Sequence, residues 1–286
     1  MKVLILGGDG YVGSVLVSRL QHKHHLTVYD LLRLQDIRDK GLIESFSRGK
    51  DALIYLAGIT NNDECESLPA FAKSINEEAF PGVVKAAKEA GIGRFIYASS
   101  VAVYGSSEIE LKEDDTLQPT TLYGKGKAFC ENYLKTVAWE IPWIITRSAS
   151  VCGYSPRMRN DLTINKMVHD ALTQHAIKVN GGKQIRCHIH MLDLCDFYGL
   201  LLEAPIEKVR NQVFNVVAKN EAVGETAHAV ASLISMTRVE FGPATDDRSY
   251  SVSGKQAEEV LGWKPKRSYA DAVQDLVIAH KAGIYV

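Results

Sequence analysis

Residues 7–30 read GGDGYVGSVLVSRLQHKHHLTVYD, directly after the apolar run of residues 2–6. That run has the length and composition of a buried parallel strand. The glycines that follow it are spaced three apart: Gly7, Gly10 and Gly13. Apolar residues then recur at helical spacing, and a second apolar run at residues 25–29 ends on Asp30. The stretch therefore predicts a strand, a glycine turn, a helix and a second strand.

Each of the three glycines has its own task in a turn of this kind. The first permits a tight turn, the second a close approach to a pyrophosphate, and the third close packing of helix on strand. The helix start then directs its N–H groups at the diphosphate. A carboxylate at Asp30 accepts hydrogen bonds from a ribose 2′-hydroxyl and repels a 2′-phosphate. We therefore predict a dinucleotide site that prefers NAD to NADP.

The bulk composition narrows the class of protein. The 286 residues include 33 basic and 34 acidic side chains, for a net charge of −1. This balance argues against nucleic acid or a membrane surface as a partner. The five cysteines lack metal-type spacing, the first strand starts at once without a signal peptide, and no apolar run approaches the roughly 20 residues of a membrane span. We expect a cytoplasmic protein with reduced thiols and no metal.

Strand-like and helix-like segments alternate along the first half of the chain. The expected strands are residues 51–57, 94–99 and 143–147, and the expected helices are residues 70–90 and 123–139. Alternation of this kind gives a parallel sheet with helices on both faces. After about residue 150 the pattern loosens, with helices expected at 162–172, near 225–235 and from Tyr269. We therefore predict an α/β, Rossmann-like doubly wound sheet in residues 1–150. Residues 151–286 are expected to form mainly a smaller substrate-binding lobe, with segments returning to the first domain.

Three polar residues form a candidate catalytic group. Ser100 follows a predicted strand, and Tyr123 and Lys127 lie four apart, on one face of a predicted helix. A nearby ammonium favours the phenolate form of a tyrosine, which can then exchange a proton with a sugar hydroxyl. A serine hydroxyl at the strand end can bond the same substrate oxygen. The pattern indicates proton transfer beside the dinucleotide.

Taken together, these motifs resemble the extended short-chain dehydrogenase/reductase family, in its branch of nucleotide-sugar epimerases and dehydratases. The matching segments cover nearly the whole chain and fall in family order: Gly7-x-x-Gly10-x-x-Gly13, Asp36-Ile37, Leu56-Ala57, Asn76, Ser99-Ser100, Tyr104-Gly105, Tyr123-x-x-x-Lys127, residues 186–193 and Leu261-Gly262-Trp263. The resemblance implies a homodimer that acts on a nucleotide-diphosphate sugar.

The resemblance also implies roles for individual residues. Tyr123 becomes the acid/base, Lys127 the group that binds the nicotinamide ribose, and Ser100 the substrate partner, with Ser99 the weaker choice. Arg186 resembles the arginine that grips the substrate diphosphate, and Arg248 is a natural second clamp because a guanidinium fork fits two phosphate oxygens. The cofactor-binding residues implied are Gly7, Gly10, Tyr11, Val12, Gly13, Asp30, Asp36, Ile37, Leu56, Ala57, Gly58, Asn76, Tyr123 and Lys127.

Several functions remain open within that resemblance. Only five residues separate Asp30 from Asp36, a short crossover similar to that of nucleotide-ketosugar reductases, and Arg33 lies close enough to meet a 2′-phosphate, so NADP stays an alternative. Val101 and Ala102 follow Ser100, where dehydratases of the family carry an acidic pair. The chain is therefore expected to be an NAD-dependent nucleotide-sugar epimerase, acting at C4. The alternatives are an NAD(P)H-dependent ketosugar reductase and, more remotely, a non-catalytic NAD-binding protein.

Overall fold

The computed structural model describes residues 1–136, 141–244, 246 and 248–285. The chain divides into two compact units whose segments interleave. Unit 1 comprises Met1–Tyr104, Thr116–Arg147 and Cys195–Phe214, and unit 2 comprises Gly105–Asp115, Ser148–Leu194 and Asn215–Val286. Each has its own apolar core. The sequence predicts a boundary at residue 150 and later segments that return to the first domain; the chain passes between the two units five times.

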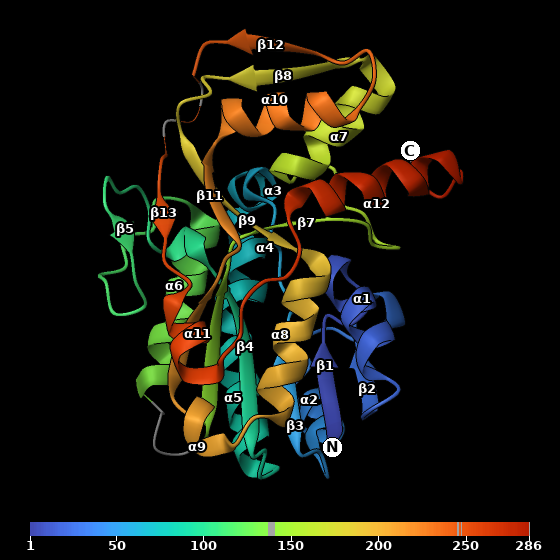
Figure 1. Ribbon diagram of the computed structural model, residues 1–286. Helices are drawn as coiled ribbons and strands as arrows, with labels where there is room; N and C mark the ends of the chain where they lie inside the picture. Colours follow the sequence, from blue (N-terminus) through green and yellow to red (C-terminus); the bar gives the residue numbers. More distant parts are fainter. Residues whose placement is uncertain (137–140, 245, 247, 286) are drawn as a thin grey trace. The chain divides into compact units, whose positions relative to one another are not determined.

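Unit 1 is built on a six-stranded sheet with strand order β10-β6-β4-β3-β1-β2 (Figure 1). Pairing of β1 with β2 and β3, and of β3 with β4, is parallel. The strands are β1 Lys2–Leu6, β2 His25–Tyr29, β3 Ala52–Tyr55, β4 Arg94–Ser100, β6 Trp143–Ser148 and β10 Gln212–Val216. β3 is buried on both faces, as expected of a central parallel strand.

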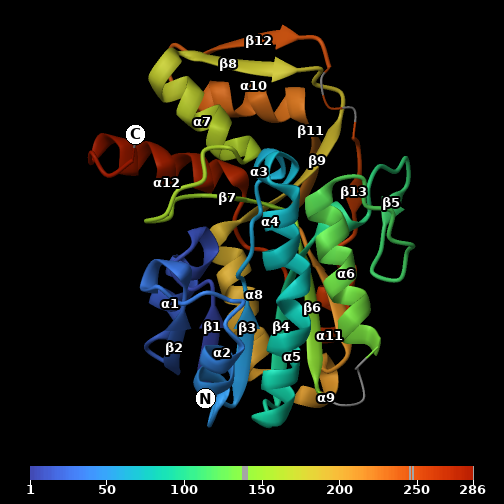
Figure 2. The same cartoon turned by 180° about the vertical axis from the view of Figure 1, so that it is seen from behind.

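Helices cover both faces of this sheet. On one face α1 lies beside α8, tied to it by an ion pair between Arg19 and Asp196 (Figure 1). On the other face are α2, α5 and α6 (Figure 2). The helical segments are α1 Tyr11–Leu20, η1 Leu31–Arg33, α2 Lys40–Ser47, α3 Asn62–Ser67, α4 Pro69–Lys73, η2 Ser74–Glu78, α5 Phe80–Glu89, η3 Val101–Val103, α6 Leu122–Thr136, α8 Met191–Glu203 and α9 Ile206–Val209. The α/β doubly wound fold predicted from the sequence is confirmed.

The predicted helix at 70–90 is interrupted in the structure. Its middle, Ser74–Glu78, is a π turn, in which the Ala79 N–H bonds to the carbonyl of Ser74 five residues back at 3.2 Å. Pro81 follows in the first turn of α5, where its missing N–H costs least. The end predicted for the next helix, Trp139, lies outside the described residues.

Unit 2 combines small sheets with helices. β11, β9 and β7 form one sheet, β8 pairs with β12, and β5 pairs with β13. The core of this unit lies among α7, α10, α12 and β8. The elements are β5 Glu110–Leu111, β7 Ser150–Cys152, α7 Thr163–Gln174, β8 Ala176–Asn180, β9 Ile185–His190, β11 Lys219–Ala222, α10 Val223–Leu233, β12 Arg238–Gly242, β13 Ser251–Val252, α11 Lys255–Leu261 and α12 Tyr269–Lys281. Across the described part of both units, no helix is long and apolar enough to cross a membrane.

Candidate active site

The glycine turn of unit 1 is packed so closely that side chains would not fit. Gly7 has φ +82°, and a Cβ there would lie 2.7 Å from the backbone N of Ala57. A Cβ on Gly13 would lie 2.7 Å from the Cα of Gly8, so α1 rests directly on the turn. No side-chain cap comes from Gly10 at the start of α1. The turn is therefore a cradle of bare backbone that fits a diphosphate, with Tyr11 and Val12 half-buried beside it.

Asp30 is held at the end of β2 by backbone donors. Its Oδ2 accepts the N–H of Asp9 from the glycine turn at 2.9 Å, and its Oδ1 accepts the N–H of Leu32 at 3.0 Å. An ionised carboxylate has about four acceptor sites, so capacity remains for ribose hydroxyls. Arg33, which the sequence suggests as a partner for the 2′-phosphate of NADP, donates to the carboxylate of Asp9 at 2.5 and 2.9 Å.

Asp36 and Ile37 follow η1, the short helical turn after β2. The carboxylate of Asp36 takes a bidentate contact from Arg38, which lowers the pKa of Asp36. Its carbonyl accepts the Tyr29 hydroxyl at 2.6 Å. Ile37 is buried in the core of unit 1. Contact with an adenine ring by this pair stays a prediction.

The loop after β3 carries three of the predicted cofactor residues and is fixed by Asn76. Leu56 and Ala57 are half-buried, and Gly58 is exposed with φ +148°. Asn76, on the π turn, accepts the N–H of Ile59 at 2.8 Å and donates to its carbonyl at 2.9 Å. Its amide thus pairs with the loop as a neighbouring strand would. Asn76 therefore supports the loop after β3 through these two hydrogen bonds.

Ser100 and Tyr123 are carried by elements that touch. The Ser100 side chain caps η3 by accepting the N–H of Ala102 at 3.2 Å. Gly124 follows Tyr123 in the first turn of α6, and a Cβ on Gly124 would lie 2.7 Å from the carbonyl oxygen of Ala102. The start of α6 therefore packs against the turn that Ser100 caps, and the absence of a side chain at Gly124 permits this contact.

Lys127 is a buried cation one turn further along α6. Its exposed fraction is 7%, and Nζ donates to the Ala98 carbonyl at 2.6 Å. Nζ also lies 5.7 Å from the ring centroid of Tyr123 and 4.9 Å from that of Tyr97. Burial lowers the pKa of Lys127 to about 8. A strongly donating ammonium is thus fixed beside the Tyr123 ring, with donors beyond the one that Ala98 takes.

A second buried charge lies behind the site and was not predicted. Glu131 is fully buried and accepts from Arg147 at 2.7 to 3.2 Å and from the Ser99 hydroxyl at 2.5 Å. Arg147 donates in turn to the Tyr104 hydroxyl at 2.6 Å. Burial alone would lower the pKa of Arg147, but its bonds to Glu131 outweigh that effect and raise it. Ser99 therefore belongs to this network, whereas the Ser100 side chain caps η3, the turn against which the start of α6 packs.

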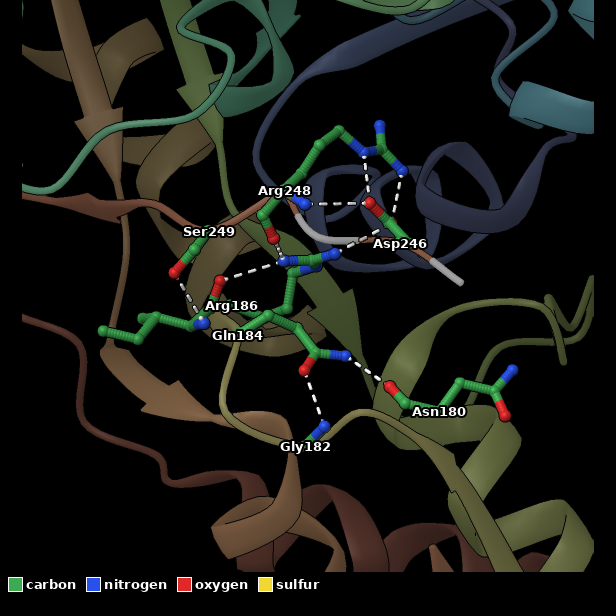
Figure 3. A network of polar contacts seen from close by, with 8 residues as sticks. Asn180, Gly182, Gln184, Arg186, Asp246, Arg248 and Ser249 are labelled. Carbon is green, nitrogen blue, oxygen red and sulfur yellow. Dashed lines mark hydrogen bonds and ion pairs between the residues drawn. The ribbon is translucent and has the colours of Figure 1, made fainter. Parts of the chain in front are cut away.

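The two arginines predicted to bind a diphosphate meet in unit 2 at one carboxylate, Asp246 (Figure 3). Arg248 donates to Asp246 at 2.8 and 2.6 Å, and Arg186 donates to it at 2.8 Å. Arg186 also donates to the Arg248 carbonyl. The bonds from Arg248 lower the pKa of Asp246 to about 2. The sequence predicts both arginines but not Asp246, and Asp247, next to Arg248 in the chain, lies outside the described residues.

Comparison with known proteins supports the family resemblance inferred from the sequence motifs. Residues 3–217 match the model of the NAD dependent epimerase/dehydratase family. The low-salt glycan biosynthesis protein Agl12 of Haloferax volcanii is 26% identical, with 97% of each chain covered. A UDP-glucose 4-epimerase of Lacticaseibacillus casei is 24% identical over 96% of this chain and 94% of that protein. A dTDP-glucose 4,6-dehydratase of an Actinoplanes strain is 26% identical over 99% and 98%.

Solved structures share the fold over the whole chain. A UDP-glucose-4-epimerase of Stenotrophomonas maltophila with bound NAD has a TM-score of 0.90 at 20% identity, covering 99% of this chain and 98% of that one. A UDP-N-acetylglucosamine 4-epimerase of Methanobrevibacter ruminantium has a TM-score of 0.89 at 22% identity, covering 99% and 98%. The roles of the glycine cradle, the acid at the end of β2 and the Tyr123–Lys127 pair stay predictions, whereas the family match spans most of the chain. The protein is thus a member of the NAD dependent epimerase/dehydratase family of enzymes.

Proposed function

We propose that this chain is an NAD-dependent nucleotide-sugar 4-epimerase. The observation that carries the proposal is the placement of Tyr123 and buried Lys127 on one face of α6, whose first turn packs on the turn capped by Ser100. The relatives named as UDP-glucose 4-epimerases, aligned over more than nine-tenths of the chain, support the same reaction class.

In this mechanism the residues of unit 1 divide the work. NAD, when bound, supplies the hydride acceptor and the hydride donor. The glycine cradle holds the diphosphate of the cofactor, and Asp30 accepts hydrogen bonds from the hydroxyls of the adenosine ribose. Tyr123 removes the proton from the sugar hydroxyl and returns it to the same oxygen after the ketosugar has turned its other face to the site. No net oxidation occurs because the hydride removed from the sugar is also returned to it. Lys127 keeps positive charge beside the phenol, and the Ser100 hydroxyl aligns the substrate oxygen.

The substrate diphosphate is assigned to the arginines of unit 2. Arg186, Arg248 and Asp246 together carry a net charge of +1, and their side chains are 12%, 31% and 38% exposed. A cluster that is partly open and positive can exchange a carboxylate contact for a phosphate contact. This supports a nucleotide diphosphate as the activating group of the sugar.

The buried residues around Ser100 disfavour dehydration. Val101 is 3% exposed, and η3, which begins there, carries only Val101, Ala102 and Val103. Elimination of water needs an additional acid and base beside the sugar, and this turn supplies neither. The resemblance to 4,6-dehydratases therefore indicates shared ancestry more than a shared reaction.

The proposal is tested by asking whether the protein retains NAD and needs no added cofactor, and by removing the Tyr123 hydroxyl. Purified protein should carry NAD at near one per chain and interconvert UDP-glucose and UDP-galactose, or another 4-epimeric pair from a panel of UDP- and dTDP-sugars, without added cofactor. Tyr123→Phe should lower kcat by about 10²- to 10⁴-fold. Tyr133→Phe removes a hydroxyl from the same helix, in the core, and should change kcat less than about twofold.

Two results would contradict the proposal. Stoichiometric consumption of NADH or NADPH with a nucleotide ketosugar, and no epimer from any sugar of the panel, would identify a reductase. Full activity of Tyr123→Phe would remove the assigned acid/base.

A further inference from the structure

The turn between β1 and α1 carries a charge that the binding of a dinucleotide does not require. Asp9 lies between Gly8 and Gly10, and its backbone N–H holds Asp30 at 2.9 Å. Its side chain holds Arg33 through two hydrogen bonds, Nε to Oδ2 at 2.5 Å and Nη2 to Oδ1 at 2.9 Å. One residue therefore contacts both side chains that bear on the adenosine ribose.

The position of Arg33 is fixed from the backbone as well. Its N–H donates to the Asp30 carbonyl at 2.9 Å within η1, and Leu34 ends that turn at φ 60°. The Arg33 side chain is about half exposed, at 49%, and the Asp9 side chain is 29% exposed. The hydrogen bonds that Arg33 donates to Asp9, followed by the charges of Asp9 and Asp30, raise the pKa of Arg33. Arg33 is therefore a permanent cation beside Asp30 that is turned onto Asp9.

The charges of this turn do not balance. Asp9 and Asp30 each contribute −1 and Arg33 contributes +1, so the turn is net negative where a 2′-phosphate of NADP would lie. We propose that Asp9 is a cofactor-specificity residue: it keeps Arg33 from serving a 2′-phosphate and adds a second negative charge against one. This inference rests on the proposed binding of NAD by this turn.

Replacing the carboxylate isolates this role. Asp9→Asn keeps the size of the side chain and the backbone N–H that bonds Asp30, removes one negative charge and releases the Arg33 fork. NADP⁺ affinity should rise by about tenfold, the size expected for one unit charge a few Å away at a partly exposed site. NAD⁺ affinity should stay within about threefold. Dissociation constants for both nucleotides are measured by isothermal titration on protein freed of bound cofactor, and co-purified nucleotide is identified by mass spectrometry.

Three further variants make the test specific. The gain should vanish in Asp9→Asn/Arg33→Ala, because that variant lacks the released guanidinium and carries the same net charge in this turn as wild type. Arg33→Ala alone leaves the charges of Asp9 and Asp30 unopposed and should lower NADP⁺ affinity by about tenfold. Glu89→Gln removes a negative charge at the end of α5 and should leave the ratio of the two affinities unchanged.

The outcomes separate this inference from the proposed function. Wild-type protein that binds NAD⁺ while Asp9→Asn shows no gain for NADP⁺ would overturn the specificity role alone. So would an NADP⁺ affinity of Arg33→Ala equal to that of wild type, because the charges of this turn would then not act on a 2′-phosphate; this measurement keeps the test open if Asp9→Asn fails to fold. Wild-type protein that binds neither nucleotide would overturn both proposals.

Discussion

Two clusters in this chain are built alike, with one carboxylate bonded by guanidinium groups, yet they lie in very different surroundings. In unit 1 the Arg147 and Glu131 side chains are 1% and 0% exposed. In unit 2 the groups around Asp246 are 12% to 38% exposed. A buried pair cannot exchange partners without leaving a charge uncompensated, whereas an exposed one exchanges with water or an anion at little cost. Burial thus makes the first cluster a structural element and leaves the second free to bind a ligand.

The largest effect is expected where the buried pair is broken. Glu131→Ala removes the carboxylate that compensates the buried charge of Arg147 and should lower the free energy of unfolding by about 3–5 kcal/mol. Asp246→Ala, the matched change in the exposed cluster, should cost less than about 1 kcal/mol. Urea denaturation followed by circular dichroism measures both. Equal losses in the two variants would show that burial does not separate the clusters.

Lys127 sharpens the comparison because it is a buried cation bonded to a carbonyl. Its pKa is about 8 in the folded protein, lowered by burial from 10.5. Between these values the unfolded chain binds more protons than the folded one, so stability gains a contribution as pH rises from 8 towards 10.5. In Lys127→Met that contribution is missing. The difference in unfolding free energy between wild type and variant should therefore shift by a few kcal/mol, in favour of wild type, between pH 7 and pH 10.

A constant difference across that range, measured by urea denaturation at each pH, would mean that Lys127 keeps its ordinary pKa. Lys125→Met, an exposed position on the same helix, is the control and should show no such shift. The same titration bears on activity, because loss of the ammonium should reduce turnover as pH rises through about 8 rather than near 10.5.

The exposed cluster should show its effect in substrate binding. Arg186→Met removes a donor that contacts Asp246 and the Arg248 carbonyl and should raise KM for the nucleotide sugar by about tenfold or more, since charge-assisted bonds to phosphate are among the strongest. Arg238→Met, at an exposed arginine of β12 in the same unit, should leave KM unchanged. An unchanged KM in Arg186→Met would show that this cluster does not bind the diphosphate of the substrate.

Salt should give the smallest and most selective effect. Raising NaCl from 0.05 to 0.5 M screens exposed charges and should raise KM several-fold. The coupling energy between Glu131 and Arg147, obtained from a double-mutant cycle on stability, should hardly change because the pair is buried. If salt weakened substrate binding and the Glu131–Arg147 coupling to the same degree, the two clusters would be electrostatically equivalent.

The first strand, the glycine turn and Asp30 could be predicted because their signals are local: an apolar run, fixed glycine spacing and a terminal acid. Tyr123 and Lys127 are also local, one helical turn apart. The Glu131–Arg147 pair could not be found this way, because charged side chains are normally exposed and the two residues meet only when α6 packs against the sheet that contains β6. Asp246 was missed for a related reason: it lies in an irregular segment, and its importance comes from two arginines whose side chains converge there.

The π turn at Ser74–Glu78 places a constraint on chain length. A π turn holds one residue more than a regular helix needs, and each extra residue rotates the remainder of the helix by about 100°. Deleting any one residue between Lys73 and Phe80 would let the helix run on regularly, and the Asn76 amide would lose its register with Ile59. Apart from Asn76 itself, the feature that must be preserved here is therefore the number of residues rather than their identity. Descendants of this sequence should tolerate substitutions around the turn far more readily than a single deletion.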